Sequence, residues 1–468
     1  MDSLVKKLGQ FSIGPIIGAV ISFITVPIIT YFISPDEYGR ASMFTLAISI
    51  LQMFVFLGMD QAYIKRYYES VDKIKLLTNS MGPSIILVLI IDVLIFFYKE
   101  NISILLFGSK SEIICVYSLI LILPGLAIEK FALMDIRMQQ RGFMYSSMTI
   151  LLKLLVVLCT IGLLILYEKS FRSIVIGTTL AQVIYSVILL VIERNHFRIK
   201  LSLFQYNEMK SLLKFGLPIV PTAIIGWVLS GMDRVMLRVY CNYSELGMYE
   251  VAFKVANVLA IVQTCFTSFW VPIAHQWNND NVDKKNFVEV GRLLAFVMTS
   301  IFIAVLIFKD LIFLIFADEY YEAVDIIPFL MIYPIMYTIS EVTVMGIYFN
   351  EKTLNLLMVS AIASIVNIVL NMCFIPYWGA VGAAIATGIS YVVFFWVRTM
   401  ISRKIWFRFP IKEYVFVTAV FILSSIINIA VNGAIIYAIN IIFLIIVIFY
   451  FKNELSRIIL FISKMLKR

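Results

Sequence analysis

An apolar stretch long enough to cross a bilayer, residues 215–240, carries three ionisable side chains close to its end, Asp233, Arg234 and Arg238. A charged group at the bilayer centre costs roughly 2.5 to 3.5 kcal/mol to insert, and such groups usually face a bundle interior or a wet cavity. Small and polar residues recur every four positions here and would share one face of a helix: Thr222, Gly226, Ser230, Arg234 and Arg238. The pattern predicts a polar, cationic surface inside a bundle.

The next apolar stretch, residues 248–275, shows a comparable polar line, made of Glu250, Lys254, Asn257, Thr264 and Ser268. Arg234 lies about six residues before the end of its stretch, and Lys254 lies about six residues after the start of the next. At 1.5 Å per residue, both are therefore expected about 9 Å below the outer membrane surface. Two interpretations stay open. The cations bind an anionic ligand, or Asp233 and Glu250 neutralise them in a structural network while Arg238 extends to the surface.

Other ionisable residues lie within predicted spans. Lys153 is expected roughly 12 Å inside the span 145–167, where it is a further candidate to bind an anion. Lys130 and Arg398, close to inner helix ends, are expected to extend to the membrane surface. The acidic residues within spans are candidates for coupling to a proton or sodium ion or for plain ion pairing: Asp92, Glu129, Asp233, Asp325 and Glu341, with Glu250 at a span end.

The elements that must position these residues follow from composition and hydropathy. The 468-residue chain is 62% hydrophobic and only 14% charged, its mean hydropathy is +0.96, and soluble domains are roughly 25% charged. Apolar runs predict an all-α integral membrane protein of about 14 transmembrane helices. They cover residues 11–33, 40–59, 81–98, 113–134, 145–167, 173–192, 215–240, 248–275, 292–316, 324–349, 353–375, 379–401, 413–431 and 434–451.

Most Lys and Arg residues fall on one side of this threading, so the positive-inside rule places both termini in the cytoplasm. A slide of about 208 residues lays Glu37 on Glu245, and one of about 210 lays Pro124 on Pro334, which indicates an internal repeat. We therefore expect two six-helix lobes in a parallel repeat around a central cavity. The predicted divisions are residues 1–200, residues 201–408, and residues 409–468 with two additional helices and a basic cytoplasmic tail.

Enzyme chemistry finds little support in the sequence. Two histidines and five scattered cysteines form no metal-binding or nucleophile motif, and no cofactor is expected. The acidic stretch SPDEYG, residues 34–39, fits a capping box in which Ser34 accepts from the third amide and Glu37 reaches back. The predicted outer loops are short, which disfavours a membrane polysaccharide polymerase. The Lys and Arg residues form no basic face, so no nucleic-acid partner is expected.

The stretch DRVMLRVYCNYSELGMYEVAFKVANVL, residues 233–259, resembles the D-R-x-x-L and E-L-G-x-Y-x-x-A-x-K pattern of polysaccharide and O-antigen flippases. These flippases belong to the multidrug/oligosaccharidyl-lipid/polysaccharide exporter superfamily. IPYWGAVGAAIATGISYVV, residues 375–393, is similar to a second segment of that family. The resemblance implies a flippase that moves an undecaprenyl pyrophosphate-linked oligosaccharide across the bacterial inner membrane by alternating access, for O-antigen, lipopolysaccharide or capsule synthesis.

What the resemblance implies for the site is a cationic cavity, with Arg234 and Lys254 meeting the pyrophosphate and Arg238 and Lys153 behind them. Implied partners are the lipid-linked oligosaccharide, the bilayer, and the polymerase and chain-length machinery. A cell-wall precursor flippase and a cation-coupled multidrug exporter of the same superfamily stay open as alternatives. The sugar, the coupling ion and the oligomeric state are not encoded in any motif of the sequence.

Overall fold

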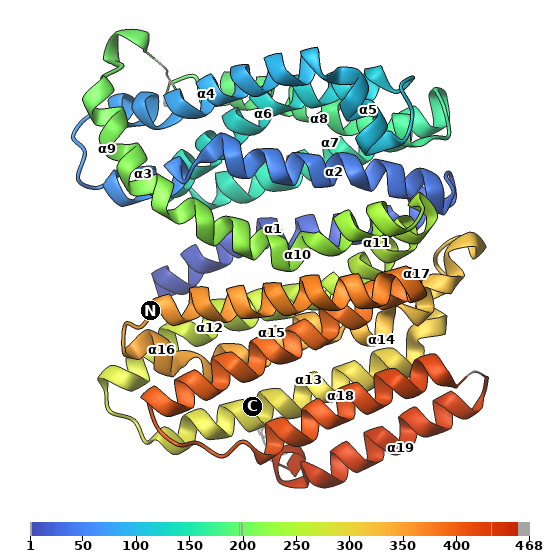
Figure 1. Cartoon of the computed structure of the whole chain (residues 1–468). Helices are drawn as coiled ribbons and strands as arrows, with labels where there is room; N and C mark the ends of the chain where they lie inside the picture. Colours follow the sequence, from blue (N-terminus) through green and yellow to red (C-terminus); the bar gives the residue numbers. More distant parts are fainter. Residues whose placement is uncertain (1, 196, 198–199, 432, 457–468) are drawn as a thin grey trace. The chain divides into compact units, whose positions relative to one another are not determined.

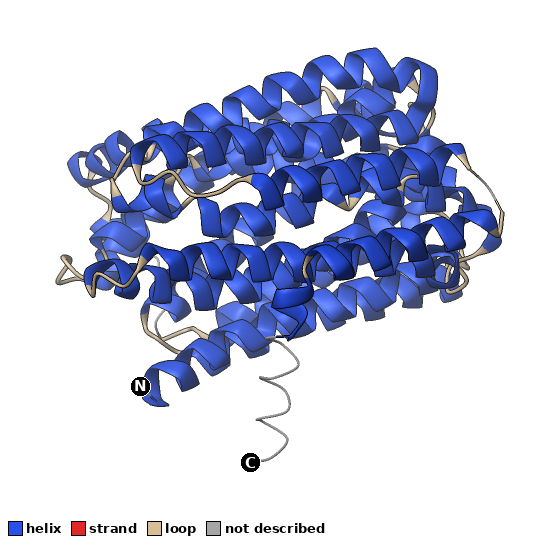
Figure 2. Ribbon diagram, turned by 90° about the horizontal axis from the view of Figure 1, so that it is seen from below, coloured by secondary structure: helices blue, strands red, loops and turns tan. Residues whose placement is uncertain are grey.

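The computed structural model describes residues 2–195, 197, 200–431 and 433–456, and these residues form helices and loops only (Figure 2). The chain divides into two compact units, Met1–Arg234 and Val235–Arg468 (Figure 1). The predicted all-helical membrane protein is confirmed. The finer domain boundaries expected from the sequence stay a prediction.

The N-terminal unit consists of helices that follow the predicted apolar runs closely. They are α1 Asp2–Thr30, α2 Pro35–Phe56, α3 Met59–Arg66, α4 Lys73–Phe97, α5 Lys99–Phe107, α6 Ile113–Met138, α7 Gly142–Leu166, α8 Phe171–Ile192, η1 Leu201–Leu203, α9 Tyr206–Gly216 and η2 Leu217–Ile219. Helix α10, Val220–Tyr240, begins in this unit and ends in the other.

The C-terminal unit continues in the same manner. Its helices are α11 Tyr243–Asn257, α12 Leu259–Asn279, α13 Lys284–Phe313, η3 Asp318–Asp325, α14 Ile327–Leu330, α15 Ile332–Thr343, α16 Met345–Phe349, α17 Leu354–Ile405, α18 Lys412–Ala430 and α19 Ile435–Tyr450. The predicted single span 248–275 lies within one candidate span, Tyr243–Asn279, in which α11 and α12 meet at Val258.

Within the described residues, 11 helices are long and apolar enough to cross a membrane, or 12 if the segments Asp318–Asp325 and Ile327–Thr343, bent by 56°, form one span. Helix α17 has 52 residues, with non-helical backbone at Gly379, where φ is 49° and ψ is −128°. The predicted runs 353–375 and 379–401 lie on the two sides of this break. Helix α19 is shorter, with 16 residues. The protein is a multi-pass membrane protein.

A glutamate near the start of α2 and another near the start of α11 hold later helices in place. The Phe171 amide, at the first residue of α8, donates to Glu37 Oε2 at 2.6 Å, and the Ala380 amide, directly after the break in α17, donates to Glu245 Oε2 at 2.7 Å. Unpaired amides at a helix start attract a carboxylate. The two bonds are equivalent under the predicted repeat, and they relate α8 to the second half of α17.

The capping box predicted at residues 34–39 is half right. Ser34 Oγ accepts from the Glu37 amide at 3.5 Å and Pro35 begins α2, as expected. The expectation that Glu37 reaches back to Ser34 is wrong, because its carboxylate binds the start of α8 instead. The Phe171 amide at the start of α8 therefore takes the Glu37 carboxylate in place of the Ser34 amide.

Short helices close one end of the N-terminal unit. Gly58 has a φ of 69° and its backbone meets that of Gly216 so closely that a Cβ on either residue would overlap the other. This contact brings α9 against α3, and Lys75 Nζ pairs with Glu208 Oε2 at 3.0 Å beside it. The segment that follows the first predicted lobe therefore contains an ordered helix, α9, packed on the bundle end.

Candidate functional site

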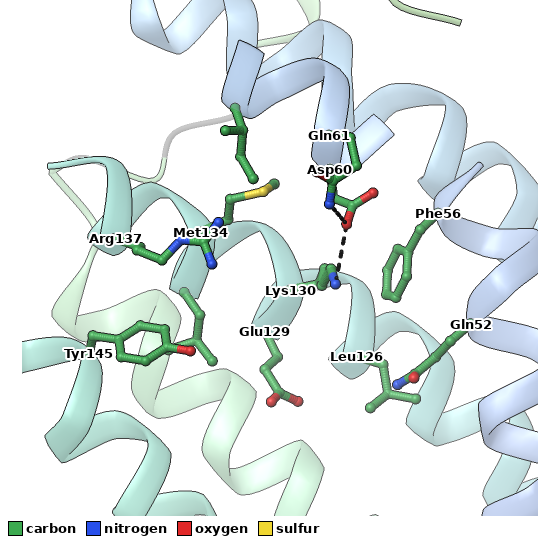
Figure 3. A pocket seen from close by; sticks show the side chains of 12 residues that line it. Gln52, Phe56, Asp60, Gln61, Leu126, Glu129, Lys130, Met134, Arg137 and Tyr145 are labelled. Carbon is green, nitrogen blue, oxygen red and sulfur yellow. Dashed lines mark hydrogen bonds and ion pairs between the residues drawn. The ribbon is translucent and has the colours of Figure 1, made fainter. Parts of the chain in front are cut away.

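A cavity of about 320 Å³ opens in the N-terminal unit among α2, α3, α6 and α7 (Figure 3). Its lining mixes charged, amide and phenolic side chains with apolar ones. The polar residues that matter most are Asp60, Gln61, Glu129, Lys130, Arg137 and Tyr145. Under the predicted topology, the ends of α2 and α6 and the start of α7 belong to the cytoplasmic side, so the cavity is predicted to open there.

Lys130 is a cavity residue that the sequence interpretation missed. Its ammonium lies 3.3 Å from Asp60 Oδ2 and 5.4 Å from the centre of the Phe56 ring, and Figure 3 shows the pair across the cavity. Its side chain is 44% exposed, and the expectation that Lys130 extends to the membrane surface stays a prediction. A partner on α3, remote along the chain, holds it here.

Glu129 lies beside Lys130 on α6 and also lines the cavity. Its Oε2 accepts a hydrogen bond from Gln182 Nε2 of α8 at 2.8 Å. The charges of Lys153 and Lys130 both act on this carboxylate. Glu129 is therefore an acidic group in a membrane bundle whose direct hydrogen-bond partner is a neutral amide.

Two cations of this unit are available to a ligand. Lys153 and Arg137 make no side-chain hydrogen bond or ion pair with any other residue that the structure describes. Lys153 is half-buried on α7, with its stem against Gly18 of α1, while Arg137 is exposed at the end of α6 and lines the cavity. An anion can therefore meet unpaired positive charge in this unit.

The predicted polar face of α10 is open. Thr222, Gly226 and Ser230 are exposed, and Arg234 is partly exposed with Nη1 donating to the Ser230 carbonyl at 2.6 Å. The neighbouring Asp233 is 2% exposed. Successive residues on a helix point in different directions, which separates the open arginine from the enclosed aspartate.

The candidate cations of the C-terminal unit differ in environment. Arg238 lies over the Tyr243 ring, with its guanidinium carbon 4.4 Å from the ring centre. Lys254 is exposed on α11, whereas Glu250 is buried one turn earlier. Arg234 and Lys254 belong to different units, so their joint action on one ligand stays a prediction.

The C-terminal unit also contains an enclosed ion pair. Arg398 Nη1 lies 2.9 Å from Glu341 Oε1, and the two side chains are only 4% and 5% exposed. The guanidinium also donates to Ser340 Oγ at 2.5 Å and lies near the Tyr337 and Phe394 rings. The expectation that Arg398 extends to the membrane surface is wrong. Its packing with Glu341 favours charge pairing over ion coupling for that carboxylate.

Two further acidic residues within spans differ in partners. The Asp92 Oδ1 atom in α4 is buried without a hydrogen-bond partner among the described residues. Asp325 Oδ1 lies 3.8 Å from the ammonium of Lys309, a buried lysine on α13 that the sequence analysis did not single out. Lys309 also donates to the Asn428 carbonyl of α18 at 3.4 Å.

A many-spanning helical bundle with a polar, partly cationic cavity is an arrangement typical of membrane transporters. The sequence profile of the polysaccharide biosynthesis protein family matches residues 28–325, and the chain belongs to this family. The chain is also 24% identical over 195 residues to a probable low-salt glycan biosynthesis flippase, Agl15, of Haloferax volcanii. That match covers 40% of this chain and only 41% of the relative's length.

The fold is that of known flippases and exporters. A structure of the lipid II flippase MurJ in an inward closed conformation matches 96% of this chain and 99% of its own, with a TM-score of 0.73 and 17% identity. A MATE transporter of Vibrio cholerae, VcmN, matches 86% of this chain and 97% of its own, with a TM-score of 0.60 and 13% identity. At these identities the likeness shows the fold alone.

Proposed function

We propose that the protein is a flippase that moves an undecaprenyl pyrophosphate-linked oligosaccharide from the cytoplasmic to the outer leaflet of a bacterial inner membrane by alternating access. The observation that carries the proposal is unpaired positive charge beside a polar cavity within a membrane bundle. Family membership and the Haloferax volcanii relative support a lipid-linked glycan as the cargo. The units would serve O-antigen, lipopolysaccharide or capsule synthesis, with polymerase and chain-length proteins as partners.

The chemistry of the headgroup matches these side chains. A pyrophosphate joined to lipid and sugar has two negative charges, and its transfer into an apolar interior without partners would be strongly unfavourable. Arg and Lys supply charge-assisted hydrogen bonds, and Arg can bind two oxygens at once. We assign this role to Arg234 and Lys254, supported by Arg238 and Lys153.

The proposed topology has fourteen crossings and both termini in the cytoplasm. It treats the two sides of the Gly379 break as separate crossings, the bent segment 318–343 as one, and α19 as the last. A reporter active only outside the cytoplasm, fused after Arg468, is expected to give no signal, whereas one inserted between α18 and α19 gives a strong signal. The reverse pattern would contradict this threading.

A cell-wall precursor flippase is the second candidate, and the full-length fold match to the lipid II flippase favours it. It shares the lipid pyrophosphate group, so the proposed cation site serves both. A cation-coupled multidrug exporter fits less well, because unpaired Lys153 and Arg137 would repel a cationic drug.

Depletion of the protein from the cell that encodes it tests the function. We expect completed lipid-linked units of normal single-repeat length to accumulate on the cytoplasmic leaflet, because synthesis continues while translocation stops. Extraction of the lipid-linked pool, with and without prior treatment of intact cells by a glycosidase, measures the leaflet. Display of unpolymerised single units outside would instead indicate a polymerase and contradict the proposal.

Substitutions at Arg234 test the site. R234A is expected to abolish export at normal membrane abundance, and R234K to retain part of it because the charge survives without the bidentate fork. If Arg234 only balances Asp233, the double variant D233A/R234A would relieve an unpaired charge and recover export. We expect that double variant to stay inactive, and its recovery would contradict an anion-binding role.

A further inference from the structure

The repeat places one acidic residue between equivalent helices in each unit, but the two acids have different partners. Pro124 of α6 and Pro334 of α15 align under the repeat, and the glutamate caps relate α8 to the second half of α17. Glu129 of α6 accepts from the neutral Gln182 of α8. Glu341 of α15 instead binds the cationic Arg398 of α17.

The counter-charge for Glu129 must therefore come from elsewhere in the N-terminal unit. Lys130 and Lys153 are the cations whose charge acts on it. Lys130 is already paired with Asp60 at 3.3 Å, which leaves Lys153. The Lys153 ammonium makes no ion pair within 4.0 Å among the described residues, so it balances Glu129 from a distance and stays open to a ligand.

If Asp60, Glu129, Lys130 and Lys153 are all ionised, these four charges sum to zero without a ligand, and Arg137 at the end of α6 adds one further positive charge to the cavity lining. An anion that binds Lys153 takes the counter-charge of Glu129. A carboxylate left in a membrane interior without a balancing cation is strongly destabilised. A protonated carboxyl avoids this cost and still accepts from Gln182 through its carbonyl oxygen.

We propose that an anionic headgroup and Glu129 compete for Lys153, so that Glu129 takes up one proton from water for each anion bound. The inference rests on the proposed function and adds a pH dependence to it. It makes Glu129 the group through which the proton concentration controls loading of the cavity.

The other titratable groups around Glu129 leave it as the proton acceptor. Tyr145 of α7 lines the same cavity, and Tyr185 of α8 is buried nearby, but both are phenols, neutral at ordinary pH. Asp60 of α3 retains its partner Lys130. Arg137 of α6 stays charged at all accessible pH values. Asp92 of α4 is nearer the opposite end of its helix, about 15 Å away in depth.

The test uses the purified full-length protein in nanodiscs and a synthetic short-chain polyprenyl pyrophosphoryl N-acetylglucosamine as the probe. Each phosphorus of this probe has one ester bond, one anhydride bond and a single strongly acidic oxygen, so the charge of the probe is constant across the experiment. Calorimetry in buffers of different ionisation enthalpy measures the affinity and the protons taken up. We expect the dissociation constant to rise with pH, by up to about tenfold per pH unit, with net proton uptake on binding.

Glu129→Gln keeps the shape and the hydrogen-bond capacity of the side chain but removes its charge. We expect its affinity to be pH-independent, as tight as that of the wild type at low pH, with no proton uptake. Glu100→Gln is the matched control, because it removes an exposed carboxylate of the same unit that pairs with Lys110, and it should behave as the wild type. A wild-type pH slope in Glu129→Gln would overturn the inference.

Lys153→Met provides a second variant in case Glu129→Gln fails to accumulate. We expect weaker binding at every pH and no proton uptake, and an unchanged pH slope in this variant would also overturn the inference. Failure of the proposed function is distinguishable, because the wild-type protein would then neither bind nor translocate the probe. Translocation by the wild type without proton uptake on binding would contradict this inference alone.

Discussion

The two units bring the same kind of residue, a glutamate in a membrane helix, into opposite situations. In the C-terminal unit, Glu341 and Arg398 neutralise each other and are almost fully enclosed. In the N-terminal unit, Glu129 contacts a neutral amide and lines a cavity whose nearby cations are partly free. An enclosed ion pair fixes a fold, whereas an acid and a cation that are not paired directly can respond to a ligand.

The largest expected effect comes from opening the enclosed pair. Arg398→Met leaves Glu341 buried without its partner, which we expect to lower the free energy of unfolding by about 3 to 5 kcal/mol. Thermal unfolding of the purified protein in detergent measures the loss. The double variant Arg398→Met/Glu341→Met removes both charges and should recover most of the stability, so an equally unstable double variant would contradict this reading.

The break in α17 has the next largest effect. Gly379 has a positive φ, and a Cβ there would overlap the Glu245 carboxylate that caps the following helix. We expect Gly379→Ala to destabilise the C-terminal unit by about 1 to 3 kcal/mol, again measured by thermal unfolding. Gly162→Ala in α7 is the control, since a Cβ there meets no neighbouring atom, and it should be neutral or slightly stabilising.

The two glutamate caps test whether the repeat extends to energetics. Glu37→Gln and Glu245→Gln each weaken a charge-assisted hydrogen bond at a helix start, and each should lower stability by about 1 to 2 kcal/mol. Comparable losses would support equivalent roles in the two units. A loss confined to one variant would show that only one cap holds its helix in place.

A smaller, pH-dependent effect is expected near the predicted outer end of the N-terminal unit. Arg172 donates to both oxygens of Glu112 at 2.7 Å, and these hydrogen bonds hold the pKa of Glu112 below its ordinary value. The resulting stability is present above the ordinary glutamate pKa of about 4.3 and is lost as pH falls through the lower folded value. Glu112→Gln should therefore lose this acid-side dependence in melting curves below about pH 5, and an unchanged dependence would exclude Glu112 as its source.

Much of the fold could be predicted because each crossing is a local property of the sequence. Apolar runs of the right length predicted the crossings, although α4, Lys73–Phe97, and α13, Lys284–Phe313, begin well before the predicted runs 81–98 and 292–316. The shared glutamates indicated the repeat. At Val258, where α11 ends and α12 begins, the backbone keeps helical angles (φ −56°, ψ −35°), so the single predicted crossing holds. The Gly379 break was expected only as a boundary between two runs.

The site was harder to predict because partners of charged residues are remote along the chain. Arg398 lies near a helix end, which favours extension to the membrane surface, yet it is buried against Glu341. The pairing of Lys130 with Asp60 joins two helices that no spacing in the sequence relates. The polar face of α10 was visible in the four-residue spacing and is indeed open. The cavity is lined by residues of α2, α3, α6 and α7. No local sequence pattern predicts that these four helices pack around one cavity.

The central claim, transfer of a lipid pyrophosphate glycan between leaflets, is tested most directly with purified protein in sealed proteoliposomes. The vesicles contain a synthetic polyprenyl pyrophosphoryl sugar in both leaflets, and a glycosidase added outside measures how much substrate becomes accessible with time. We predict that wild-type vesicles expose the inner-leaflet pool rapidly, and that R234A vesicles are as slow as protein-free ones. Wild-type vesicles as slow as protein-free vesicles would contradict the account.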